Sequence, residues 1–332
     1  MHIKLYLKRG YRKCFVLIFF GITQLLGSTG LYGVEKPKQA VTYTFSGGRF
    51  GDNVLAYLHA KWFSYRFGVS LFYKKFPYSD QLCLSDYEIP FKKFSQKNFQ
   101  RSLVLQEEDN IEMKMKQSVN NLSTLYTIKY FGETSWGQNS PFNVDWEDVH
   151  FRAIIKQMIS PKYPIDNNIQ LPKDCLSVAI HIRTGGNFEP DMHDVWPLKA
   201  PRPEFFIEQL RYLYTFLGQV PLYVHIFTDD QHPQRLRKLF AQKLKDLNLK
   251  INCSDPVEGW SNRVLEDFFA MTKFDCSIHG DSNFSVCAGL ISDYKVEIRP
   301  ISVKEVGDRI VIDRILMRLH LHPTDQVEYI DI

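Results

Sequence analysis

The chain has 332 residues, 44% of them hydrophobic, 14% aromatic and 23% charged, so it can bury a normal core and fits two domains of about 150 residues. Its formal charge of +4 comes from residues 1–34, which hold five basic residues and no acidic one; the remainder carries 36 basic against 37 acidic residues. A nearly neutral body argues against a polyanion-binding surface, so we expect no nucleic-acid partner.

Residues 1–34 are predicted to direct export. Five basic residues precede a charge-free run of 21 residues at 14–34, which ends among small residues. The pattern fits a cleaved signal peptide, and the run is also just long enough for a retained membrane anchor. In both cases the basic flank stays cytoplasmic, so we expect an exported protein or a single-pass type II membrane protein with its main domain on the non-cytoplasmic side.

An N-terminal α/β domain is predicted for residues 40–160. It opens with a strand at 41–45, a helix at 54–67 that Gly68 ends, and a second strand at 69–73, which together form a βαβ unit. The pattern is weak between residues 74 and 140, with short candidate strands at 102–105 and 126–130.

A helix closes this domain. Asp145 is a candidate N-cap, the apolar spacing continues through Met158, and Pro161 and Pro164 stop the helix. We therefore place the domain boundary at residues 160 and 161.

The second domain, residues 161–332, alternates strands and helices regularly. Strands are expected at 176–182, 222–228, 249–252, 275–279 and 295–299, and helices at 203–217, 233–244, 262–274 and 284–291. Such alternation is typical of a doubly wound parallel sheet, so the fold class is α/β.

Cysteines organise neither a disulfide framework nor a metal site in this sequence. Five follow Cys14, none in a CxxC pair or at zinc spacing. Cys276 and Cys287 could form a disulfide, although buried free thiols are the better interpretation. We expect no metal and no cofactor.

Three predicted strands end in polar residues: "HIRTGG" from His181, "FTDD" from Phe227 and "IHGDSNFS" from Ile278. The carboxyl ends of parallel strands meet at one edge of a sheet, where ligands bind. Arg183 could grip a diphosphate there with its two-pronged guanidinium, or form an internal salt bridge. Amides of residues 282–285, at the start of a helix, could bind an anion.

The other polar residues allow two interpretations each. Asp229 or Asp230 could hold a ribose or a base, or cap the following helix, and Ser282 could be a plain N-cap. His181 is either part of the site or a hydrogen-bonded core residue. The next loop offers four candidate general bases or solvated side chains, namely Glu189, Asp191, His193 and Asp194.

Residues from about 40 to 300 contain four motifs that occur in the same order in a known protein family. They are "GGRFGDNVLAYLHAKW", "HIRTGG", "IFTDD" and "LEDFFAMTKFDCSIHGDSNFSVCAGL". The set resembles the inverting GDP-fucose-dependent fucosyltransferases of the α1,2, α1,6 and protein-O groups. That resemblance implies a GT-B fold, with two Rossmann-like domains facing each other across a cleft.

The resemblance also implies roles for residues. Arg183 would bind the donor β-phosphate, and His181 would shape the pocket. A base would come from the loop of residues 189–194, with Glu189 and Asp191 as the catalytic candidates, or none would be strictly required. Donor binding would fall to Gly47, Gly48, Gly51, Asn53, Asp229, Asp230, Ser282, Asn283, Phe284 and Ser285. The implied reaction transfers a sugar from a GDP-sugar to a glycan or glycoprotein acceptor, with inversion and without metal.

The sequence departs from the family at the arginine motif. Thr184 occupies the place of the second arginine, and Gly185 and Gly186 replace the acidic residue that usually follows. A charge that would stabilise the leaving GDP is thereby lost. A catalytically inactive descendant that binds glycan or nucleotide is therefore the alternative.

Overall fold

The computed structural model describes residues 38–91, 96–106, 109, 111–117, 122–129, 144–166, 169–184, 192–254, 263–307, 309–320 and 327–332. The export segment predicted at residues 1–34 lies outside these ranges. Within them, no helix has both the length and the apolar character needed to cross a membrane.

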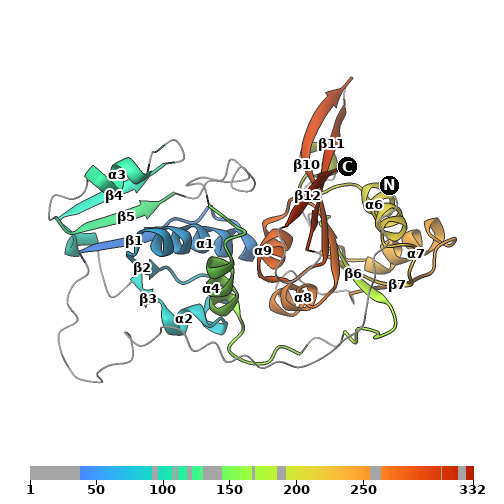
Figure 1. The fold of residues 1–332 in the computed structure, drawn as a ribbon, viewed down its shortest axis with the longest axis horizontal. Helices are drawn as coiled ribbons and strands as arrows, with labels where there is room; N and C mark the ends of the chain where they lie inside the picture. The colour runs from blue at the N-terminus through green and yellow to red at the C-terminus, as the bar shows by residue number, and fades with distance from the viewer. Residues whose placement is uncertain are drawn as a thin grey trace. The chain divides into compact units, whose positions relative to one another are not determined.

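The N-terminal sheet contains five parallel strands in the order β3-β2-β1-β5-β4 (Figure 1). The strands are β1 (Gln39–Tyr43), β2 (Ser70–Tyr73), β3 (Ile89–Pro90), β4 (Arg101–Leu105) and β5 (Thr124–Ile128). The helices are α1 (Phe50–Phe67), α2 (Leu84–Tyr87), α3 (Ile111–Gln117) and α4 (Val149–Ile159), with 3-10 turns η1 (Ser79–Gln81) and η3 (Gln96–Asn98). The βαβ prediction is confirmed, and both weakly patterned strands exist.

The C-terminal sheet contains seven strands in the order β12-β11-β10-β9-β6-β7-β8. The strands are β6 (Leu176–Ile182), β7 (Leu222–Thr228), β8 (Leu249–Cys253), β9 (Cys276–His279), β10 (Val296–Val306), β11 (Arg309–Leu319) and β12 (Glu328–Asp331). The helices are α5 (Met192–Val195), α6 (Pro203–Phe216), α7 (Pro233–Lys243), α8 (Val264–Met271) and α9 (Asn283–Ile291). From β10 to β8 every neighbouring pair is parallel, as predicted.

One edge of this sheet differs from the prediction. The last strand was expected to end at residue 299, but β10 continues to Val306 and turns back antiparallel as β11, which β12 then pairs. Gly307 makes the turn with φ +62°, a conformation that glycine adopts without strain. Beyond residue 300, apolar and charged residues roughly alternate, which suits a strand with solvent-exposed faces.

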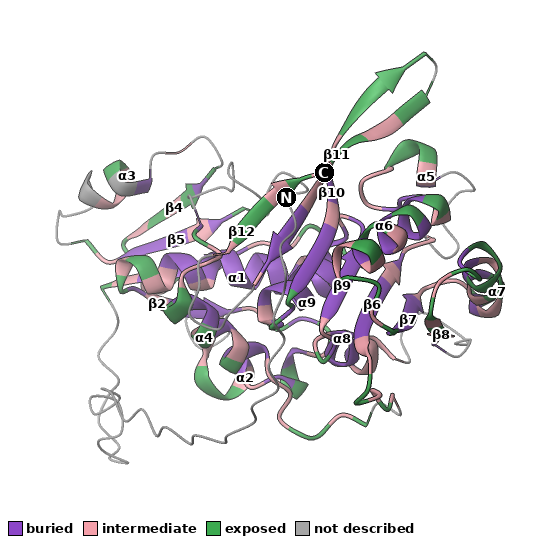
Figure 2. Cartoon of the chain, turned by 45° about the vertical axis from the view of Figure 1, so that its right-hand side comes forward, coloured by how far each residue is buried: buried purple, intermediate pink, exposed green. Residues whose placement is uncertain are grey.

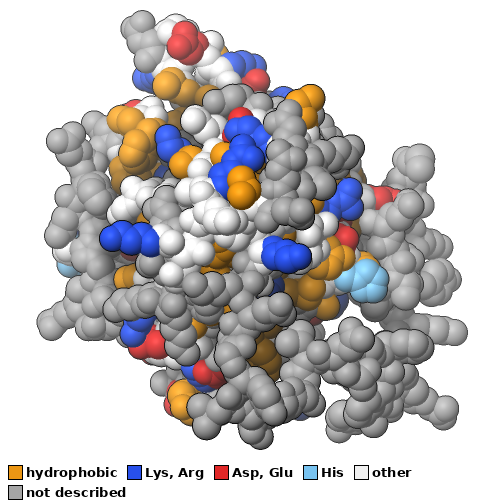
Figure 3. Space-filling view, turned by 90° about the vertical axis from the view of Figure 1, so that its left-hand side faces the viewer, with side chains coloured by type: hydrophobic (Ala, Val, Ile, Leu, Met, Phe, Trp, Pro, Cys, Tyr) orange, Lys and Arg blue, Asp and Glu red, His pale blue; other side chains and the backbone are white. Residues whose placement is uncertain are grey.

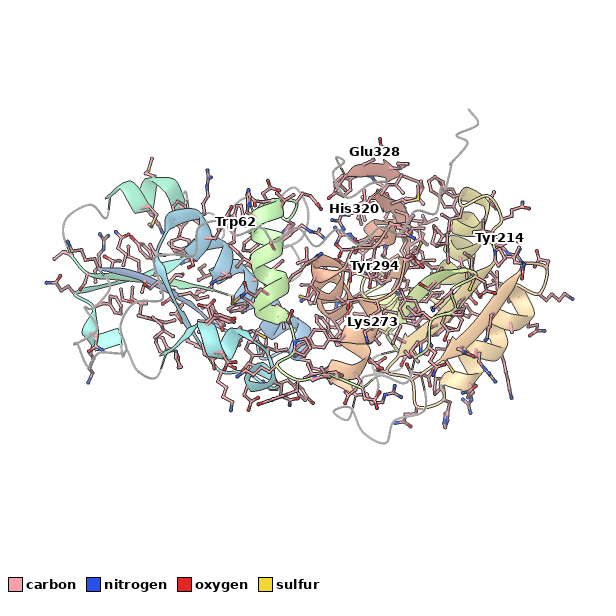
Figure 4. All side chains as sticks on the ribbon, turned by 60° about the horizontal axis from the view of Figure 1, so that its bottom comes forward. Trp62, Tyr214, Lys273, Tyr294, His320 and Glu328 are labelled. Atoms are coloured by element: carbon pink, nitrogen blue, oxygen red, sulfur yellow. The ribbon has the colours of Figure 1, made fainter. Side chains whose placement is uncertain are left out.

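The N-cap of α4 also differs from the prediction. Asp148, not Asp145, accepts hydrogen bonds from the amides of His150 (2.9 Å) and Phe151 (2.8 Å). Phe151 fixes this register, because it is fully buried and packs edge-on against Trp62 of α1 at 5.0 Å between ring centroids. Trp62 is labelled on α1 in Figure 4.

Hydrophobic packing joins the helices of the two sheets. One cluster holds buried residues of β1 and α1 together with Phe268 of α8 and Ala288 of α9, while a second lies between the C-terminal sheet and α6 and α7. Cys276 and Cys287 are buried free thiols, so their pairing was the wrong alternative. Residues 37–332 form one compact unit, and the boundary at 160 and 161 stays a prediction.

A buried ion-pair network ties the segment before α4 to the last strands. Glu147 accepts from Arg318 (2.8 Å) and from the hydroxyl of Tyr329 (2.7 Å), and Arg318 also contacts Glu297 (3.2 Å). Glu297 in turn contacts His279 at 2.8 Å.

On the face in Figure 3, the coloured basic side chains stand in separate small groups rather than as a continuous basic surface.

Candidate functional site

A cavity of about 600 Å³ lies at the carboxyl ends of β6 and β7. Its remaining walls come from the start of α1, the loop after β2, and the starts of α8 and α9. Most predicted site residues line it, namely Gly48, Gly51, Asn53, His181, Arg183, Asp229, Asp230, Ser282, Asn283 and Phe284.

Sheet register explains why the three polar strand ends converge. His181 of β6 lies beside Phe227 of β7 on one side and His279 of β9 on the other. Because all three strands run parallel, the residues after them emerge at one edge, and that prediction is confirmed.

Arg183 follows β6 directly. No carboxylate of the described residues lies within ion-pair distance of it, and its buried Nε has no hydrogen-bond partner among them. The internal salt bridge considered from the sequence is therefore not seen. Burial lowers the pKa of Arg49, and the positive charge of Arg183 lowers it further. Arg49 and Arg183 thus share one cavity with a third lining arginine, Arg263, which pairs with Asp267, and this arrangement favours an anionic ligand.

The N-terminus of α9 faces the same cavity. Ser282 is its N-cap, with no hydrogen bond from its side chain to the helix, and Ser282, Asn283 and Phe284 line the cavity. Helix N-termini carry unpaired amides and partial positive charge, so they suit phosphate groups. Ser285 does not line the cavity: it is fully buried, and its hydroxyl donates to the carbonyl of Ser282 at 3.1 Å.

The glycine-rich turn brings α1 and α9 into contact. Gly51 packs so closely that a Cβ atom there would lie 2.6 Å from the carbonyl carbon of Asn283. Asp52 connects the same two helices, accepting from the Arg49 amide (2.9 Å) and from Nδ2 of Asn283 (2.7 Å). Gly47, at φ +88°, lies outside the cavity lining.

We expect Gly51→Ala to destabilise the protein by roughly 1–3 kcal/mol, because the added methyl meets the α9 backbone. Helix propensity alone predicts the opposite sign, a gain of up to about 1 kcal/mol. Chemical denaturation measures the difference, and a stabilised Gly51→Ala protein would contradict the close helix contact.

The aspartates after β7 have structural partners. Asp229 accepts from the amide (2.7 Å) and the hydroxyl (3.1 Å) of Thr184, which fixes the chain leaving β6. Asp230 accepts from the amide of His232 at 2.6 Å and so shapes the entry to α7, but His232 itself is the N-cap and no side chain caps the helix, so the capping alternative is not what the structure shows. Both still line the cavity, so a ligand role for them stays a prediction.

His181 is held neutral. Burial, His279 and Arg183 together lower its pKa to about 3. Its ring lies 5.4 Å from that of Phe284, and its buried Nδ1 has no partner among the described residues. A neutral imidazole can exchange hydrogen bonds with a ligand but adds no charge to the site.

The candidate bases are only partly described. Glu189 and Asp191 lie outside the described residues. His193 contacts the carbonyl of Ala200 through Nδ1 at 2.7 Å, and Asp194 forms an ion pair with Arg202. Neither His193 nor Asp194 lines the cavity.

Several solved structures resemble this chain. Arabidopsis thaliana FUT1, solved as an arginine mutant in complex with GDP, gives a TM-score of 0.51 at 13% identity, over 82% of this chain and 72% of that one. E. coli heptosyltransferase WaaC with ADP-2-deoxy-2-fluoro heptose gives 0.33 at 9% identity, over 77% and 87%. No family profile and no curated protein sequence matches the chain. The likeness to FUT1, a fucosyltransferase, decides the architecture.

The chain has a GT-B fold. Loops and helix starts that belong to both Rossmann-like sheets line the cavity, as the resemblance implied. Across the described part of this GT-B fold, no three His, Cys, Asp or Glu side chains are grouped so as to hold a metal ion.

The sequence predictions missed about half of the residues that line this GT-B cavity, and three of those matter most for a ligand. Arg49 stood inside the quoted glycine motif without a role. Asp267 of α8 has a buried Oδ1 that accepts no hydrogen bond from the described residues and lies 3.7 Å from the guanidinium of Arg263. Burial raises the pKa of Asp267 to about 6, against the lowering effect of the Arg263 charge. Tyr78 lines the cavity in a left-handed conformation (φ +70°), its ring edge-on to Phe50 at 6.0 Å. An acidic residue within the apolar run "LEDFF" was the available signal for Asp267.

Proposed function

We propose that the chain is a glycosyltransferase that transfers a sugar from a GDP-sugar to a glycan or glycoprotein acceptor. The observation that carries this proposal is the convergence of Arg183, Arg49 and the N-terminus of α9 on one cavity. Two arginines and helix-end amides can together neutralise a diphosphate. GDP in the solved FUT1 complex supports the choice of nucleotide class.

Asp267 supports guanine as the base. A carboxylate can accept hydrogen bonds from both the N1–H and the exocyclic amine of guanine, whereas adenine offers no such adjacent donor pair. Oδ1 of Asp267 is buried and accepts no hydrogen bond from the described residues; its ion-pair partner Arg263 lies 3.7 Å away, so this oxygen can still accept from the base. Tyr78 supplies an aromatic wall of the kind against which a base can stack.

In the proposed reaction, an acceptor hydroxyl oxygen attacks the anomeric carbon on the face opposite the diphosphate. The bond from that carbon to the β-phosphate oxygen breaks, its electron pair leaves with GDP, and the configuration inverts. Arg183 and Arg49 stabilise the charge that develops on the leaving group. The hydroxyl proton passes to Glu189 or Asp191, two of the candidate bases in the loop after β6, or to water.

The alternative function is a catalytically inactive protein that binds nucleotide or glycan. Thr184 favours it, because this residue stands where the second arginine was expected and its polar groups are bound to Asp229. Arg49 favours catalysis, because it returns a second positive charge to the cavity. Release of GDP from a GDP-sugar only when acceptor is present would separate the two.

Calorimetric titration with GDP, ADP, UDP and CMP tests the donor class. We expect GDP to bind most tightly and its affinity to be unchanged by EDTA, Mn²⁺ or Mg²⁺, because arginines and amides provide the positive charge. Loss of GDP binding in EDTA with recovery on adding Mn²⁺ would overturn the arginine-based account. Preference for another nucleotide would overturn the assignment of guanine.

A further inference from the structure

The hairpin of β10 and β11 extends beyond the parallel part of its sheet, and its far half is coloured exposed in Figure 2. Apolar side chains on this half are in water: Val303 is 38% exposed, Val306 53% and Ile310 42%. A two-stranded hairpin without further cover is only marginally stable in water, so this half would gain from a third strand.

The outer edge of β11 is open where the hairpin projects. β12 pairs only with Leu316–Leu319, and one further bond runs from the amide of Ile332 to the carbonyl of Ile315. Within the described chain, no strand pairs with residues 309–314 on that side. An open edge with apolar neighbours is a template for another strand.

We propose that this edge pairs with the same edge of a second copy of the chain, around a two-fold axis through Val311. A two-fold perpendicular to the sheet must pair residues equidistant from one central residue, because opposed side chains have to point to the same face. Centred on Val311, the pairing uses residues 309–313, the stretch that β12 leaves uncovered.

This register is self-complementary. It sets Arg309 opposite Asp313 of the second copy, and Ile310 opposite Ile312, each combination occurring twice. Opposed charges and opposed β-branched residues both stabilise antiparallel pairs. Arg309 has no ion-pair partner among the described residues, so its charge is available for this contact.

Neighbouring registers set less favourable residues opposite each other. Centring the axis on Asp313 sets that carboxylate opposite its own copy, and centring it on Ile310 sets Arg309 opposite Val311. With Val311 at the centre, Ile310 and Ile312 of both copies form one apolar face. Val303, which pairs with Ile312 across the hairpin, extends this face.

The test uses sedimentation of the full chain across a concentration series up to roughly 100 μM, because an interface of five residues a side is small and its dimer weak. We expect a monomer–dimer equilibrium. Arg309→Asp and Asp313→Arg should each weaken it about tenfold or more, since each change sets like charges opposite each other twice. Lys304→Asp, a charge reversal on β10, is the matched control and should leave the dimer intact.

Mixing gives the decisive measurement. The Arg309→Asp and Asp313→Arg proteins are each mismatched alone but complementary together, so an equimolar mixture should dimerise as the wild type does. A double variant with both changes should also dimerise. A monomeric wild type, undiminished dimers of the single variants, or a mixture that stays monomeric would each overturn the proposal. Melting curves confirm that each variant is folded.

Discussion

Replacing Arg183 by alanine is expected to weaken GDP binding by roughly 2–4 kcal/mol while leaving the protein folded. The guanidinium lines the cavity and forms no ion pair with a described carboxylate, so its loss leaves none of the described carboxylates without its partner. Removal also relieves the repulsion that lowers the pKa of Arg49. Arg183→Lys keeps the charge but loses the two-pronged geometry, so its affinity should fall between those of wild type and alanine.

Titration calorimetry and melting temperature on the same proteins check this prediction. Guanosine, which lacks phosphates, should bind wild type and Arg183→Ala alike. Arg211→Ala is the control, because Arg211 pairs with Asp246 at 2.7 Å on the surface and lies outside the cavity lining. A folded Arg183→Ala protein with unchanged GDP affinity would remove Arg183 from the donor site.

The second large effect is expected at Asp267. Asp267→Asn should weaken GDP by roughly 1–3 kcal/mol, because the amide sets a donor against the donor edge of guanine. Inosine diphosphate, which lacks the exocyclic amine, should lose less. Equal losses of affinity for GDP and inosine diphosphate would mean that the base does not lie against Asp267.

The pH dependence of GDP binding follows from the same carboxylate. Its pKa of about 6 means that wild-type affinity should fall as pH drops below about 6, where Asp267 becomes protonated. A terminal phosphate titrates in the same range, so Asp267→Asn supplies the baseline to subtract. A difference between the two proteins that stays constant from pH 5 to 8 would contradict this account.

The free energy of unfolding of the ligand-free protein should decrease as pH rises, whereas the affinity for GDP should increase. The pKa of Asp267 is raised from the usual 3.8, so the unfolded chain loses this proton first, and the carboxylate lowers the free energy of unfolding as pH rises from about 4 to about 6. Asp267→Asn should therefore stabilise the ligand-free protein by roughly 1–3 kcal/mol at pH 7 and by almost nothing at pH 4. Denaturant titrations at both pH values measure the gain.

The parallel part of the fold could be predicted because its strands end abruptly. β6 and β7 have the predicted bounds, since buried apolar runs stop at charged residues or at a proline. The hairpin beyond residue 300 was missed because its alternation of charged and apolar residues marks a strand without telling where its partner lies. Such pairing is decided by the turn at Gly307 and by tertiary contacts.

The cavity lining was predictable where a motif supplied the residues, as at His181 and Arg183. Asp267 was missed because one acid in a helix normally faces water, and only packing shows that this one is enclosed. Gly51 was expected near the donor, and it lines the cavity, yet its closest neighbours are backbone atoms of α9. The distance between two helices 230 residues apart is not encoded in any local pattern.

The contact between α1 and α9 also sets an order of events during synthesis. Asp52 meets Asn283 231 residues later in the chain, and the core around α1 includes residues of α8 and α9. Ribosomes add about 5–20 residues per second, so the apolar side of α1 waits on the order of ten to fifty seconds for its cover. The N-terminal strands and α4 can cover part of α1 during that interval, but its α9-facing side stays exposed to water until the end of synthesis.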